Sequence, residues 1–473
     1  ARATFHEQFV EWADSVNREG ATEYEEILGY HLEQAYRYRS ALGPIDDHGR
    51  ALGVDGSQRL ASAGRRAFAR GDAPAAVNLL GRAAALLPER EDARLTLMAE
   101  YGEALLQAGR FQDADAAVAE TIELGRETGA RQAVAWASLV RLLVRLRTSE
   151  QEHWRDEAAV TITEAMAVFE EAGNPAGLAM GWRLLAWTHG VACRFGLAAE
   201  AQEYALEEAR LADDVRQQSR AATAYAVCAV FGPTPVSEAI DRCERMLEQV
   251  SGDRHAEGIL HGYVATLIAM QGAFERAREL VARARALLEE LGLEVEGALV
   301  AIEAWRIEIL AGDPAAAESE LRAAYDALDA VGEKYILSTV AGHMARTQYA
   351  LGRFDDAERM GTLVEELATE DDIDTQAMWR CARAKMLARQ GSFAQAEALA
   401  REALEILAPT DGVLLKFGAL LDLAEVQRLA GRADESRAAL EEAQALAELK
   451  GSVVMSSAAR DLLAALDDRS LVS

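Results

Sequence analysis

A short phrase recurs along this chain, and it constrains the fold more than any other feature. The phrase is a glycine, an aromatic residue two positions later and an alanine five positions later, as in Gly352, Phe354 and Ala357. Toward the C-terminus its glycine recurs every 39 or 40 residues, at positions 272, 312, 352, 391 and 431. Self-similarity at a period of about 20 to 50 residues is typical of repeat proteins. The repeat therefore predicts an elongated array of similar structural units.

Small residues form columns at matching places in the repeats. The eighth position of each first helix and the twentieth and twenty-seventh positions of each repeat are mostly Gly or Ala, as in Gly102, Ala265 with Ala277, and Ala284. A small side chain lets two helix axes approach closely, whereas a Leu would hold them apart. The repeats should therefore be helical hairpins, about ten of them. Trp305 stands at the eighth position of one repeat, which leaves open a slip of one residue in the register there.

Composition supports helices and excludes several functions. Acidic residues outnumber basic ones by 78 to 49, a net charge of −29, which repels nucleic acid and anionic membranes. The 4 cysteines show no C-x-x-C pair, so neither a metal site nor a disulfide framework is predicted. No apolar run is long enough to span a membrane. We expect a soluble, cytoplasmic all-α protein that binds no cofactor, metal, membrane or nucleic acid.

The chain divides into three predicted parts. Residues 1–54 should form helices that lead from an upstream domain, with helices at 3–16 and 23–42 and a short third one that ends at Gly53. Residues 55–451 should hold the repeats, with a long polar loop at 148–155 and a turn at 232–235 as irregularities. Residues 452–473 should form a capping helix, at 452–467, and a tail.

Residues 60–450 resemble the tetratricopeptide repeat (TPR) superfamily, on the Gly-x-Phe-x-x-Ala turns. The segments Ile27–Tyr38 and Ala63–Val77 are similar to the C-terminal region of actinobacterial signalling proteins that join a class III nucleotide cyclase to a signal-transducing ATPase. The resemblance implies a right-handed superhelix with the first helix of each hairpin on the inner wall, and a regulatory role. The chain has no Gly-Lys dipeptide and hence no phosphate-binding P-loop. No other catalytic motif occurs, so the chain is predicted not to be an enzyme.

Recognition is expected at the ninth position of the first helices, which faces the concave groove in this repeat type. Three successive repeats carry cations there, Arg306, Arg346 and Lys385. They could receive an anionic peptide segment or a carboxyl terminus. The alternative is that they pair with acidic residues of the adjacent repeat. Both interpretations remain open from the sequence.

Trp187 also occupies a ninth position, beside Arg183, and is a candidate exposed binding anchor. The predicted function is a non-enzymatic scaffold for protein–protein interaction and signal sensing, which regulates upstream ATPase or cyclase domains. Its partner would be a protein, a peptide or an intramolecular segment. The alternative function is a small-molecule or peptide receptor. An apolar closed pocket near Trp187 would favour the receptor, and an open charged groove a protein partner.

Overall fold

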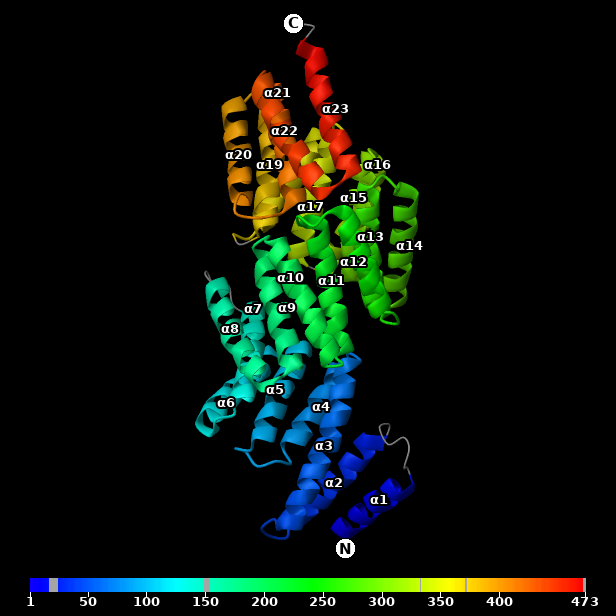
Figure 1. The fold of residues 1–473 in the computed structure, drawn as a ribbon, viewed down its shortest axis with the longest axis vertical. Coiled ribbons are helices and arrows are strands. Elements are labelled where there is room, and N and C mark those ends of the chain that lie inside the picture. Colours follow the sequence, from blue (N-terminus) through cyan, green and yellow to red (C-terminus); the bar gives the residue numbers. More distant parts are fainter. Residues whose placement is uncertain (17–23, 149–153, 332, 371, 471–473) are drawn as a thin grey trace. The chain divides into compact units, whose positions relative to one another are not determined.

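The computed structural model describes residues 1–16, 24–148, 154–331, 333–370 and 372–470, drawn in Figure 1. These residues form 23 α-helices and no strand, so the predicted fold class is confirmed as an all-α array of TPR-like helical hairpins. The first helices are α1 (Arg2–Val16), α2 (Glu25–Ser40), α3 (Asp47–Ala69), α4 (Ala73–Ala84), α5 (Asp92–Gln107), α6 (Phe111–Thr128), α7 (Arg131–Thr148), α8 (Trp154–Ala172), α9 (Pro175–Val191), α10 (Phe195–Leu211), α11 (Val215–Phe231) and α12 (Val236–Gln249). The remainder are α13 (Arg254–Met270), α14 (Phe274–Glu290), α15 (Glu294–Leu310), α16 (Pro314–Val331), α17 (Lys334–Ala350), α18 (Phe354–Leu367), α19 (Ile373–Arg389), α20 (Phe393–Leu407), α21 (Val413–Leu429), α22 (Ala433–Lys450) and α23 (Val453–Ser470).

The chain forms two compact units. Unit 1 comprises Ala1–Trp182 with Leu211–Arg216, and unit 2 comprises Arg183–Arg210 with Gln217–Ser473. Within each unit, helices that follow one another pack as pairs, for example α5 with α6 in unit 1 and α13 with α14 in unit 2. No helix in the described part of the chain is both long and apolar enough to cross a membrane.

The regular repeats of unit 2 keep the period that the glycines predict. Helices α13, α15, α17, α19 and α21 are each 17 residues long. Their first residues are 40, 40, 39 and 40 positions apart. The register therefore does not slip in α15. Trp305 occupies the eighth position of the sequence repeat, the place that Ala265 and Ala345 take in α13 and α17. It is accommodated because its ring stacks on His343 at a centroid distance of 3.8 Å and its Nε1 donates a hydrogen bond to Thr347.

The small residues and the turn glycines act as the pattern requires. Ala265, Ala277 and Ala284 are fully buried between α13 and α14. The glycines between paired helices adopt positive φ angles, such as 87° at Gly272 and 75° at Gly352. Only glycine adopts this conformation without a steric cost, and it lets the chain reverse direction within a few residues.

The N-terminal helices differ from the prediction at one point. Helix α3 continues through Gly53, where the sequence pattern had ended a short helix, and runs on to Ala69. The glycine serves packing there: a Cβ atom on Gly53 would lie 2.9 Å from the carbonyl oxygen of Leu86 and 3.0 Å from the ring of Tyr36. Most of the predicted loop at 148–155 lies outside the described residues.

The turn at 232–235 and the helix at the C-terminus lie close to where the sequence places them. The segment 232–235 connects α11 to α12 as predicted. The final helix is α23, and Ser452 precedes it as a cap whose hydroxyl accepts a hydrogen bond from the backbone N–H of Met455.

Unit 2 is closed by contacts between segments more than 200 residues apart. At the start of α10, the carboxylate of Asp411 accepts hydrogen bonds from the backbone N–H groups of Phe195 at 2.5 Å and Gly196 at 2.8 Å. At the end of α11, the Nζ atom of Lys450 donates to three carbonyl groups, those of Ala229, Gly232 and Thr234, at 2.6 to 3.0 Å.

These two contacts match the partial charges of the helix ends, because an anion is favoured at a helix N-terminus and a cation at a C-terminus. The side chain of Lys450 is fully buried, and burial lowers its pKa to about 7, although the three carbonyl acceptors favour the charged form. The 408–412 connection and the end of α22 are thereby bound to α10 and α11.

Candidate ligand-binding site

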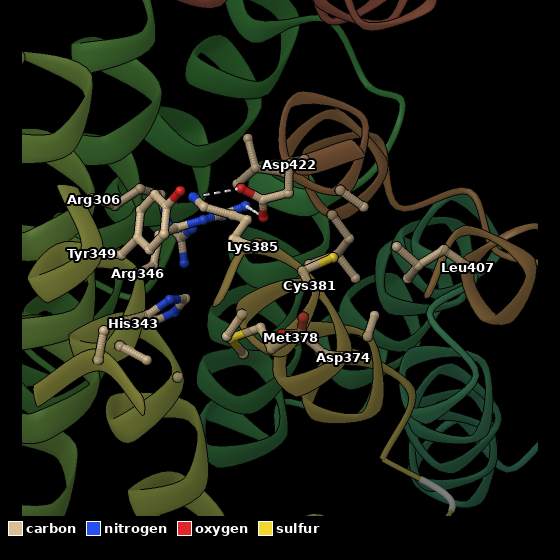
Figure 2. Close-up of a pocket in the computed structure, with 18 of the residues that line it drawn as sticks. Arg306, His343, Arg346, Tyr349, Asp374, Met378, Cys381, Lys385, Leu407 and Asp422 are labelled. Atoms are coloured by element: carbon tan, nitrogen blue, oxygen red, sulfur yellow. Dashed lines mark hydrogen bonds and ion pairs between the residues drawn. The ribbon is translucent and has the colours of Figure 1, made fainter. Parts of the chain in front are cut away.

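A pocket inside unit 2 brings the three predicted cations together. Its lining comes from α11, α15, α17, α18, α19, α20 and α21, and its volume is about 70 Å³. Arg306, Arg346 and Lys385 all line it, from three successive repeats, as Figure 2 shows. The 40-residue period places the same position of each helix on the same wall, which is why the column converges.

Two of the three cations are neutralised within the protein. Asp422 of α21 accepts a hydrogen bond from Arg346 at 2.5 Å and another from Lys385 at 3.0 Å, drawn as dashed lines in Figure 2. Lys385 also lies 3.4 Å from a carboxylate oxygen of Glu425. Burial alone would raise the pKa of Asp422, but the two cations outweigh it and hold the pKa below its usual value. For Arg346 and Lys385, pairing with acids of other repeats is therefore the interpretation that the contacts favour.

Arg306 is placed differently. Its side chain is 11% exposed, and its guanidinium lies 4.9 Å from the ring centroid of Phe231. Its nearest acid is Glu303, with Nε and a carboxylate oxygen 3.5 Å apart, and that carboxylate already accepts a hydrogen bond from Thr266 at 2.6 Å. Among the described residues, no hydrogen bond to the guanidinium is found, and its Nε is buried without a partner. Arg306 thus lines the pocket with donors to spare.

His343 presents a second unpartnered polar atom on the same pocket. Its ring is stacked on Trp305, the residue is 7% exposed, and its Nδ1 has no hydrogen-bond partner in the described part of the structure. Burial lowers its pKa well below the usual value, and the charges of Arg306 and Arg346 lower it further. The imidazole is therefore neutral at physiological pH.

Asp374, half-buried in the first turn of α19, also lines this pocket. Burial and the nearby Asp372 raise its pKa to about 7, against the opposing charges of Arg306 and Arg346. Its carboxyl group makes no hydrogen bond or ion pair to any described residue. The adjacent wall is apolar and unreactive, since burial raises the pKa of the Cys381 thiol to about 12.

The remaining predicted residues lie elsewhere. Arg183 and Trp187 are on α9, and neither lines this pocket. Arg183 donates a hydrogen bond to Gln217 at 2.9 Å, and Trp187 is 39% exposed. The structure does not bring them to the three cations, so their role in binding stays a prediction.

Sequence reasoning missed His343, Asp374 and Asp422. In the repeat register that places the cations at position nine, His343 and Asp422 occupy position six. Residues three apart lie on the same helix face, so this column could have been read together with the cations. Asp374 carries no such signal, because an acidic residue in the first turn of a helix ordinarily complements the helix dipole.

Comparison with known proteins gives similarity in fold. No protein-family model matches the chain, and no curated protein matches it. Yeast Tom70 is 14% identical with a TM-score of 0.39, over 95% of this chain and 97% of that chain. A Rap protein complexed with competence and sporulation factor is 11% identical with a TM-score of 0.45, over 80% and 99%. The human IFIT1 dimer with m7Gppp-AAAA is 13% identical with a TM-score of 0.45, over 88% and 94%. The function must therefore be argued from the site.

Proposed function

We propose that unit 2 is a non-enzymatic binding module that takes an acidic group of a protein or peptide partner at Arg306. The observation that carries this proposal is a guanidinium that is largely buried, lines a pocket and makes no hydrogen bond to the described residues. Glu303 lies 3.5 Å from Nε but accepts no hydrogen bond from it, and burying donors without a hydrogen bond costs free energy that a bound carboxylate would recover.

The size of the pocket limits what enters. Pockets for drug-sized molecules usually measure about 300 to 1,000 Å³, whereas this one measures about 70 Å³. It accommodates one end group, such as an acidic side chain or the last residue of a chain. Trp187 does not line it, so a receptor for a larger small molecule has less support than a module for a peptide or protein.

Short labelled peptides test the proposal. An acetylated, amidated tripeptide that begins with aspartate should bind the 473-residue chain, and the same peptide with asparagine should bind at least tenfold more weakly. Arg306→Gln should remove this difference, measured by fluorescence anisotropy, while Arg460→Gln on the exposed face of α23 should keep it. Equal binding of the two peptides to the wild-type chain would refute the assignment.

The regulatory role implied by the resemblance is a proposal of the same kind. Occupancy of the pocket would be transmitted through the packed repeats to ATPase or cyclase domains of a larger signalling protein. Deleting residues 60–473 from that protein should change its nucleotide turnover and its partner binding. Unchanged turnover and binding would contradict the regulatory role and leave the binding module intact.

A further inference from the structure

The pocket holds more unsatisfied polar chemistry than an acid alone can satisfy. A carboxylate on Arg306 would leave the ionised form of Asp374 without a partner, because two charged carboxylates repel each other. Asp374 and Arg306 line the same pocket of about 70 Å³, which places both groups around one small volume.

The charges of the pocket indicate what Asp374 would accept. Asp422 and Glu425 already balance Arg346 and Lys385. Once an acid is bound at Arg306, the remaining group is an acceptor, and a cationic donor gives it a charge-assisted bond about twice as strong as a neutral one. The Nδ1 atom of His343 adds one donor or one acceptor, according to its tautomer.

We infer that this pocket recognises an ammonium group next to a carboxylate, with the acid on Arg306 and the ammonium on Asp374. The inference rests on the proposed function and narrows its ligand. The shared chemistry occurs at the free amino terminus of a chain whose first residue is acidic, and in a free acidic amino acid.

Binding of an ammonium group at Asp374 should release a proton. Asp374, with a pKa of about 7, is half protonated at neutral pH, and an ammonium ligand would ionise it. The charged and titratable groups that act on it or line the same pocket include Asp372, Arg306, His343, Arg346, Cys381, Lys385 and Asp422.

None of those with a shifted pKa titrates near neutrality. The pKa of His343 lies well below its usual value, that of Asp422 is lowered, those of Lys385 and Arg346 are raised, and that of Cys381 is about 12. Affinity for the free amino terminus should therefore rise with pH from 6 to about 7 and level off as that amino group, whose usual pKa is about 7.7 to 8.0, loses its proton. Affinity for the blocked acid should not rise.

The experiment uses the 473-residue chain and three probes: a tripeptide amide that begins with aspartate and has a free amino terminus, its acetylated form, and free L-aspartate. Isothermal titration should show the free peptide binding roughly 10- to 100-fold more tightly than the acetylated one, as expected for one charge-assisted hydrogen bond. Asp374→Asn should abolish this preference and retain the acetylated peptide, which also shows that the variant is folded. Asp461→Asn, on the exposed face of α23, should behave as wild type.

Each outcome decides something. Equal binding of the free and acetylated peptides, or a preference that survives Asp374→Asn, overturns the inference and leaves the acid site at Arg306 standing. No binding by any probe at millimolar concentration overturns the proposed function as well. Free aspartate that binds as tightly as the free peptide supports the inference with an amino acid as ligand, and weaker binding supports it with a chain end.

Discussion

Replacing Asp422 by asparagine should destabilise the centre of unit 2 far more than an ordinary surface substitution. Asp422 holds two cations from two other repeats, and its side chain is 8% exposed. Neutralising it leaves Arg346 and Lys385 facing each other without their shared anion. Breaking a buried ion pair from one side costs about 3 to 5 kcal/mol.

For Asp422→Asn the expected cost lies at the low end of this range of about 3 to 5 kcal/mol. The side chain of Lys385 is 10% exposed, but that of Arg346 is 37% exposed, so water screens part of its charge. Lys385 also keeps Glu425 at 3.4 Å. We therefore expect a loss of about 3 kcal/mol in the free energy of local opening, which corresponds to roughly 150-fold faster amide exchange.

Hydrogen exchange read by mass spectrometry can measure this effect in peptides from α17, α19 and α21. Asp461→Asn is the matched control and should change exchange there by less than about 0.5 kcal/mol. Replacing all three side chains by apolar ones, with Arg346→Met, Lys385→Met and Asp422→Leu, should recover most of the loss. If Asp422→Asn accelerates exchange no more than Asp461→Asn does, the ion cluster does not hold these repeats together.

The effect should also depend on pH in a defined direction. The folded-state pKa of Asp422 is lowered, so its stabilisation is present above the unfolded-state pKa of about 3.9 and is lost as the pH falls through the folded value. The difference between Asp422→Asn and wild type should therefore shrink in acid. A difference that stays constant down to pH 2 would contradict this linkage.

Three further changes have definite expected outcomes. Gly102→Ala should destabilise unit 1 by about 1 to 3 kcal/mol in urea unfolding, because the new Cβ would lie 2.4 Å from Cγ1 of Val118, whereas Gly361→Ala meets nothing closer than 3.8 Å and should not. Asp213→Gly should stabilise the chain by roughly 0.5 to 1 kcal/mol, since Asp213 is exposed with a φ of 53°, and a lower melting temperature would contradict this. Because the pKa of Asp374 is raised, its contribution to the free energy of unfolding is present below about pH 4 and is lost as the pH rises to about 7. Asp374→Asn should therefore gain stability relative to wild type between pH 4 and pH 8. The same difference in urea midpoint at both pH values would refute this.

Much of the architecture could be predicted because it is encoded locally. The turn glycines, the small residues and the aromatic positions recur within each 40-residue repeat, and each acts on neighbours one hairpin away. The same periodicity predicted that Arg306, Arg346 and Lys385 lie on one wall, and all three line one pocket. The periodicity could not show which of the three cations forms hydrogen bonds to an acid, since all three occupy the same repeat position.

Lys385 finds its acids in the adjacent repeat, whereas the partner of Arg346 lies in a repeat that is not adjacent. Arg346 reaches Asp422 from 76 positions away, and Lys450 reaches α11 from 221 positions away. Such distances close only after small rotations have accumulated over several repeats, and no local pattern records that curvature. The sequence therefore determines the repeat and the face on which its cations stand, whereas the curvature of unit 2 brings Arg346 to Asp422 and leaves Arg306 with Glu303 of its own helix.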